Sequence, residues 1–136
     1  MSEHQPRVLD ASALIALFHG HPDLWQYLVE ADKGGTNIAI PTNAVLEAQV
    51  ILRCSQSAWN SMLNFDGVFE LPLSLHAARE AGDLARPRME FELPHRVLTG
   101  PPMVGHVLRE ALVTTGVIIT SVPEAYFGHE VAINTF

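Results

Sequence analysis

The 136-residue sequence has little cysteine, little charge and no long apolar run. Its one cysteine, Cys54, cannot form an intrachain disulfide, which favours a reducing compartment. No apolar run approaches the ~20 residues that a membrane-spanning helix requires. The first residues, Met1–Pro6, lack the basic and apolar regions of a signal peptide. These absences predict a soluble cytoplasmic protein that does not enter a membrane.

Basic residues are also scarce. Eight Lys and Arg stand against fifteen Asp and Glu, so the net charge is −7, and Lys33 is the only lysine. Such a chain does not adhere to nucleic acid or membranes through its overall charge, which leaves a local basic groove as the route to RNA. Because 48% of the residues are hydrophobic, the chain can bury a core, and its length predicts one domain, 1–136.

Several common kinds of site lack their sequence patterns. The seven histidines and Cys54 do not have the spacing of zinc ligands. There is no glycine-rich phosphate-binding motif. A phospho-receiver domain needs a lysine at a strand end, whereas Lys33 is expected in a turn.

Short apolar segments alternate with longer segments of helical periodicity. The expected strands are Arg7–Asp10, Asn37–Ile40, Val68–Leu71, Val117–Thr120 and, more weakly, Val131–Ile133. The expected helices are Ser12–Phe18, Asp23–Ala31, Asn43–Arg53 continuing towards Leu63, Leu75–Ala85 and Met103–Thr114. Strands separated by helices predict parallel pairing with right-handed crossovers. The fold class is therefore α/β, a three-layer α/β/α sandwich around a central, mainly parallel sheet of four to five strands.

The segment Arg86–Pro102 is rich in proline and carries Arg86, Arg88 and Arg96. Its prolines predict an unusually long loop. The three arginines could form a basic lip that contacts RNA phosphates. The alternative is that they only keep an exposed loop solvated.

Asp10 and Ser12 stand between the first expected strand and the first expected helix. A carboxylate at the carboxyl end of a parallel strand faces the crevice where open α/β sheets bind ligands. In one interpretation Asp10 ligates a divalent cation and Ser12 supports it, since hard cations prefer oxygen ligands. In the other, both residues cap the helix.

Glu47 lies in the middle of an expected helix among apolar residues, at Ala44, Val50 and Ile51. Capping does not explain an acid at such a position. An ionised carboxylate among buried neighbours requires a partner, so Glu47 is the second candidate metal ligand. A polar stripe with Gln49 would instead make it a surface residue.

Three segments together resemble the PIN-domain family over essentially the whole chain. They are Leu9-Asp10-Ala11-Ser12-Ala13-Leu14, Pro41 leading into the helix with Glu47, and the segment from Gly116 to Tyr126. PIN domains are metal-dependent nucleases, and many of this size are VapC-type toxins that cleave RNA and pair with an antitoxin. The resemblance implies that Asp10, Glu47 and Ser12 are catalytic and that Mg²⁺ or Mn²⁺ is the cofactor.

The acidic cluster of that family is incomplete here. Val104 and Val122 stand where a third and a fourth carboxylate are usual, and Glu124, His106 and Glu110 are the nearby polar residues. Glu124 is a weak extra candidate ligand, whereas His106 and Glu110, four residues apart, could simply pair on one helix face. Two carboxylates and a hydroxyl hold one cation weakly, which predicts weak metal binding and impaired cleavage.

Two hypotheses about function follow. The first is a Mg²⁺-dependent single-strand endoribonuclease of a toxin–antitoxin system. The alternative is a non-catalytic RNA- or protein-binding module of the same fold. The high apolar content, with Trp25, Trp59, Leu63 and Phe65 to bury, also predicts a homodimer or a helical protein partner such as an antitoxin.

Overall fold

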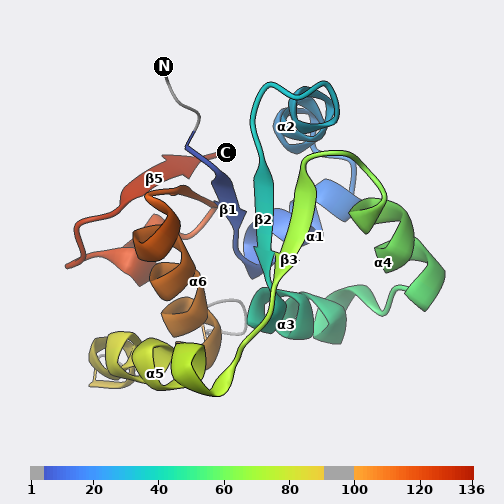
Figure 1. Cartoon of the computed structure of the whole chain (residues 1–136). Helices are drawn as coiled ribbons and strands as arrows, with labels where there is room; N and C mark the ends of the chain where they lie inside the picture. Colours follow the sequence, from blue (N-terminus) through green and yellow to red (C-terminus); the bar gives the residue numbers. More distant parts are fainter. Residues whose placement is uncertain (1–4, 91–99) are drawn as a thin grey trace.

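A computed structural model describes residues 5–90 and 100–136, with side chains up to residue 85 in the first range. Five strands form one sheet in the order β3-β2-β1-β4-β5, and all four pairings are parallel (Figure 1). The strands are β1 (Arg7–Leu9), β2 (Ile38–Pro41), β3 (Val68–Leu71), β4 (Val117–Thr120) and β5 (Ala132–Thr135). The predicted parallel sheet is therefore confirmed, including its weakest strand.

Six α-helices and a 3₁₀ turn connect the described strands. They are α1 (Ala11–Phe18), α2 (Pro22–Asp32), α3 (Thr42–Leu52), α4 (Gln56–Leu63), α5 (Leu75–Glu90), α6 (Pro101–Thr114) and η2 (Pro123–Tyr126). Figure 1 shows α5 and α6 on one side of the sheet and α1, α2 and α4 on the other. The α3 helix contacts both α1 and α6, at the end of the sheet where the strands finish. In the described part of the chain, none of the helices has the length and apolarity needed to cross a membrane.

The core lies on both faces of the central strands. Leu9, Ile38 and Ile118 are fully buried, as expected for parallel strands covered by helices on both faces. Tyr126 is also fully buried and is among the largest side chains in the core. Because its hydroxyl is buried with the ring, Tyr126 must find a polar partner inside the core.

The prediction of one long helix from Asn43 towards Leu63 is wrong. The helix ends at Leu52 because the next residue, Arg53, adopts a left-handed conformation, with φ of 54°. Ser55 then caps α4 by accepting a hydrogen bond from the backbone N–H of Ala58 at 3.1 Å. The Gln49 side chain stabilises the break, because it hydrogen-bonds both the backbone N–H and the C=O of Cys54.

The prediction of a loop over Arg86–Pro102 is wrong at both of its ends. The backbone of α5 stays helical to Glu90 and passes Pro87 in its last turn, and α6 begins at Pro101. Proline is favoured in the first turn of a helix, where its missing N–H costs nothing, so Pro101 and Pro102 start α6 instead of extending the loop. Arg96 lies outside the described residues, as do the side chains of Arg86 and Arg88.

Close contact between α5 and α6 depends on small residues. Ala77, Ala81 and Ala85 lie one turn apart on α5 and are buried against α6. Gly105 of α6 is so close to them that an added Cβ would collide with the Ala81 carbonyl oxygen. This packing fixes the position of α6 and hence of its N-terminus.

We expect Gly105→Ala to lower the free energy of unfolding by about 1–3 kcal/mol, because the added methyl group forces the helices apart. The matched control is Gly82→Ala on α5, where an added Cβ meets open space. There the gain in helix propensity should stabilise the protein by about 0.5–1 kcal/mol. Urea unfolding of both variants measures the difference, and two changes of the same sign would contradict the packing argument.

Candidate metal centre

Asp10 follows β1 directly and is completely buried. Its Oδ1 accepts hydrogen bonds from the Ser12 hydroxyl at 2.7 Å and from the backbone N–H of Ala13 at 3.0 Å. Its Oδ2 accepts one from the hydroxyl of Tyr126 at 2.8 Å. Asp10 is thus the N-cap of α1, so the capping interpretation of this residue is confirmed.

Burial raises the pKa of Asp10 above its ordinary value of 3.8, because removal from water penalises the charged form. Hydrogen bonds from Thr120, Ser12, Ala13 and Tyr126 act against this rise. Burial thus favours the neutral form of Asp10, whereas the donors that the protein supplies favour the charged form.

Ser12 connects Asp10 to the end of β4. Its hydroxyl donates to Asp10, accepts from the backbone N–H of Ser121 at 3.0 Å and lies 3.3 Å from the Thr120 hydroxyl. The Thr120 hydroxyl in turn accepts from the backbone N–H of Val122 at 2.9 Å. Ser12 thus joins the ends of two neighbouring strands.

Glu47 is half-buried on α3, and its Oε1 accepts from the backbone N–H of Gly100, the N-cap residue of α6, at 3.4 Å. The approach is close enough that an added Cβ at Gly100 would collide with the Glu47 carboxylate. The pKa of Glu47 is raised, first by burial and then by the negative charge of Asp10, while the Gly100 hydrogen bond opposes the rise. The effect of the Asp10 charge on the pKa of Glu47 indicates that the two acids lie near each other, at the carboxyl edge of the sheet.

The other positions of the expected acidic cluster do not add ligands. Val104 is buried, Val122 is half-buried, and Glu124 is exposed on η2. Within residues 5–90 and 100–136, no group of three or more His, Cys, Asp and Glu side chains is arranged to hold a metal ion. Among the described side chains, Asp10, Ser12 and Glu47 thus come to one edge without a third acid beside them.

The donor set fits a resident Mg²⁺ or Mn²⁺ ion poorly. Hard cations need several oxygen ligands with free lone pairs, and they keep some of their water. Both oxygens of Asp10 already accept hydrogen bonds from the protein, and the side chain has no exposed surface. In this arrangement the residues present do not fit the divalent cation that the resemblance implies.

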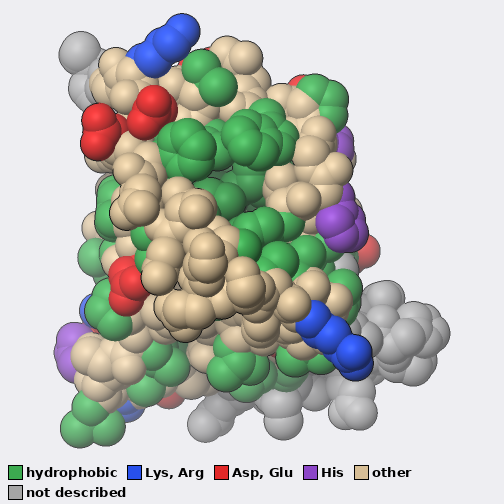
Figure 2. Space-filling view, turned by 90° about the vertical axis from the view of Figure 1, so that its right-hand side faces the viewer, with side chains coloured by type: hydrophobic (Ala, Val, Ile, Leu, Met, Phe, Trp, Pro, Cys, Tyr) green, Lys and Arg blue, Asp and Glu red, His purple; other side chains and the backbone are tan. Residues whose placement is uncertain are grey.

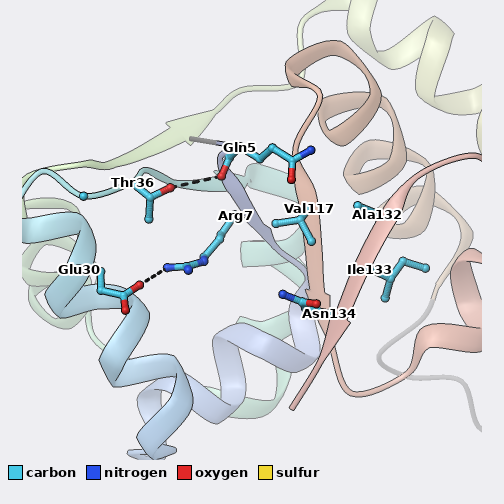
Figure 3. Close-up of a pocket in the computed structure, with 9 residues that line it drawn as sticks. Gln5, Arg7, Glu30, Thr36, Val117, Ala132, Ile133 and Asn134 are labelled. Atoms are coloured by element: carbon cyan, nitrogen blue, oxygen red, sulfur yellow. Dashed lines mark hydrogen bonds and ion pairs between the residues drawn. The ribbon is translucent and has the colours of Figure 1, made fainter. Parts of the chain in front are cut away.

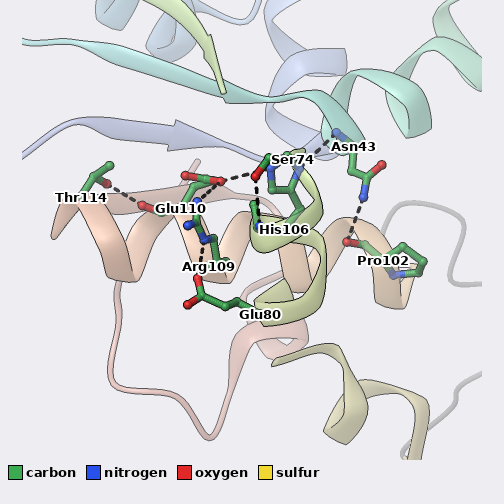
Figure 4. A network of polar contacts seen from close by, with 9 residues as sticks. Asn43, Ser74, Glu80, Pro102, His106, Arg109, Glu110 and Thr114 are labelled. Carbon is green, nitrogen blue, oxygen red and sulfur yellow. Dashed lines mark hydrogen bonds and ion pairs between the residues drawn. The ribbon is translucent and has the colours of Figure 1, made fainter. Parts of the chain in front are cut away.

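His106 and Glu110 form a separate buried pair on α6 (Figure 4). His106 Nε2 lies 3.2 Å from Glu110 Oε2, within ion-pair distance but without hydrogen-bond geometry, and its Nδ1 accepts from the backbone N–H of Asn43. Burial lowers the pKa of His106 despite the opposing charge of Glu110, so the ring stays neutral near pH 7. The predicted pairing of the two residues on one helix face is confirmed. From α6, this pair faces α3 and α5.

Arg109 supplies the positive charge that Glu110 needs. It donates from Nη1 to Glu110 Oε2 and from Nε to Glu80 Oε1, both at 2.9 Å. Because Glu80 belongs to α5, the network also fastens α5 to α6 (Figure 4).

A cavity of about 510 Å³ lies at the opposite end of the strands, between α2 and β5 (Figure 3). It is lined in part by Arg7, Glu30 and Asn134. Arg7 donates to Glu30 at 2.6 Å and stacks over the ring of Tyr27 at 4.1 Å. Its positive charge is therefore paired within the protein. The size of this cavity therefore does not identify it as the chemical centre.

Sequence reasoning missed the role of Tyr126. Nothing near Tyr126 in the sequence indicates a contact with a residue 116 positions away. The one signal is chemical, because a tyrosine hydroxyl that becomes buried needs a hydrogen-bond acceptor.

The raised pKa of Glu47 predicts a specific pH dependence. Between the ordinary value of 4.5 and the raised pKa, the folded state binds more protons than the unfolded state. The contribution of Glu47 to stability therefore falls as pH rises through this window and levels off above it. We expect the stability of Glu47→Gln relative to wild type to increase over the same window, measured by urea unfolding from about pH 4 to 8. Glu124→Gln is the exposed control, and a difference that falls with pH at Glu47→Gln would contradict the burial argument.

No protein-family model matches the chain, and no curated protein matches it in sequence. Solved structures are similar to it over nearly their whole length. One is a chain of VapBC2 from Rickettsia felis bound to a DNA fragment from their promoter, with 14% identity, a TM-score of 0.67 and coverage of 96% of this chain and 98% of that one. Another belongs to a toxin–antitoxin complex from Klebsiella pneumoniae, with 18% identity, a TM-score of 0.61 and coverage of 95% and 96%. At these identities the likeness shows the fold, and it confirms the PIN-like α/β architecture that the sequence predicted.

Proposed function

We propose that this PIN-like domain works by binding a partner protein of the antitoxin type in the cytoplasm, without metal-dependent catalysis. The observation that carries this proposal is the exposure of apolar residues on α3. Leu46 and Val50 are each 64% exposed and Ile51 is 45% exposed, and these three residues are the α3 stripe. Residues four apart on a helix lie side by side, so Leu46 and Val50 present one apolar surface.

A cleft of about 370 Å³ lies between α3 and α4. Its lining is mixed, with Val45, Trp59 and Leu63 beside polar residues such as Gln49 and Glu70. On the neighbouring face formed by α2 and α4, hydrophobic side chains gather around a hollow (Figure 2). Exposed apolar surface of this kind is typical of protein-interaction sites.

Charge favours a protein partner over RNA. Five basic residues have described side chains, and three of them, Arg7, Arg79 and Arg109, are in ion pairs with acids. The net charge of −7 adds repulsion to a polyanion. The similar structures are toxin–antitoxin assemblies, which supports an antitoxin as the partner.

The α3 stripe can be tested with a matched pair of substitutions. The partner is sought as the product of a small gene immediately upstream. Leu46→Gln should weaken its binding by about 10-fold or more, because a buried leucine contributes about 1.5–3 kcal/mol. Leu75→Gln is the control, since Leu75 is 90% exposed at the start of α5, outside the stripe. Calorimetry on the purified proteins measures both. Equal affinity for the two variants would remove the stripe from the interface. A dimer of the chain alone that Leu46→Gln dissociates would instead assign the stripe to a homodimer.

The second candidate function is a Mg²⁺- or Mn²⁺-dependent endoribonuclease with weak activity. It is favoured by the proximity of Asp10 and Glu47 at the carboxyl edge of the sheet, with Ser12 beside them. Asp10 and Glu47 would hold the ion with Glu124 as a weak additional ligand, and Arg86, Arg88 and Arg96 would contact RNA. The chemistry that a bound ion supplies is activation of water and stabilisation of the leaving oxygen.

Incubation of diverse single-stranded RNAs with Mg²⁺ or Mn²⁺ distinguishes the two functions. We expect wild type to show no cleavage above Asp10→Asn, because the Asp10 oxygens are already used within the protein. Metal-dependent cleavage by wild type that Asp10→Asn abolishes would establish the nuclease and overturn the proposal. Equal cleavage by both would indicate a contaminating ribonuclease.

A further inference from the structure

The two carboxylate oxygens of Asp10 obtain their hydrogen-bond donors from different parts of the chain. Oδ1 obtains its donors locally, from Ser12 and Ala13 at the start of α1. A cation at the carboxyl edge would be expected to use Oδ2, yet this atom accepts a hydrogen bond from Tyr126. The donor to Oδ2 thus comes from a segment 116 positions away in the sequence.

The chain delivers Tyr126 to this place through η2. After β4 ends, Val122 hydrogen-bonds back to Thr120, and the 3₁₀ turn Pro123–Tyr126 follows. Ala125 and Tyr126 are buried, while Glu124 and Phe127 are exposed. The Tyr126 hydroxyl also lies 3.8 Å from the sulfur of Met103 in the first turn of α6. The Tyr126 hydroxyl therefore contacts both the residue that caps α1 and the first turn of α6.

We propose that the Tyr126 hydroxyl takes the place of a divalent cation at Asp10, so that the acid serves as a structural anchor for η2. The hydroxyl satisfies Oδ2 and holds η2 against the junction of β1 and α1. A parallel arrangement exists at Glu47, whose carboxylate accepts from the backbone at the N-terminus of α6. Both acids thus bind groups of the protein itself. This inference stands on its own and does not depend on which partner binds α3.

The contact is tested by a double-mutant cycle on thermal unfolding in EDTA, with Asp10→Asn, Tyr126→Phe and the double variant. Each single substitution should lower Tm by about 5–10 °C, since a buried hydrogen bond to a charged group is lost. The double variant should lose much less than the sum, because the second change removes a partner already lost. Tyr27→Phe is the matched control at the other tyrosine, a half-buried one that stacks under Arg7, and it should leave Tm almost unchanged.

Metal dependence separates this role from a ligand role. With ionic strength matched by a monovalent salt, millimolar Mn²⁺ should leave the Tm of wild type the same as in EDTA. A Mn²⁺-dependent rise in wild type that Asp10→Asn abolishes would overturn the proposal, as would strictly additive losses in the cycle.

Wild type alone supplies a measurement that does not depend on how well the variants fold. Mn²⁺ is paramagnetic and broadens the NMR signals of nearby amides. Titration of wild type with Mn²⁺ should not selectively broaden the amides of Asp10–Ala13. Selective broadening there at low Mn²⁺ would place a cation at the carboxylate and refute the substitution by Tyr126.

Discussion

The edge of the sheet is organised by one buried carboxylate. An ionised Asp10 with no exposed surface is tolerable only if the protein supplies hydrogen bonds that replace water. Those donors come from the start of α1, the end of β4 and η2. Satisfying one charge therefore fixes the relative positions of segments more than one hundred residues apart in sequence.

The second acid extends the same principle to α6. Glu47 accepts from the backbone N–H of Gly100, the N-cap residue of α6, at the end of the helix where the dipole favours negative charge. The close packing of Gly105 on Ala81 sets where that helix begins relative to α3. The buried network of His106, Arg109 and Glu110 then fastens α6 to α5 and α3. The acid pair is thus held by ordinary helix packing and hydrogen bonding.

A shared fold leaves the chemistry of the site open, because function belongs to particular side chains placed on a scaffold. The likeness to toxin–antitoxin structures spans the chain at 14–18% identity, so it fixes the architecture. The side chains at the carboxyl edge differ from those a two-metal nuclease needs, with valines at positions 104 and 122. Exposed apolar residues on α3 give the chain a surface suited to a protein partner. The balance of these features favours binding over catalysis.

The sequence by itself determined the strands, their parallel pairing and the position of Asp10 at the end of β1, because apolar periodicity and helix caps are local signals. It also identified Glu47 as an acid without a capping role. It did not reveal the break after Leu52, which depends on the left-handed Arg53 and on the bonds of Gln49 to Cys54. Nor did it reveal the contact of Tyr126 with Asp10. Only the tertiary structure decided which donors reach a buried charge, because such donors are selected by proximity in space and leave no pattern in the chain.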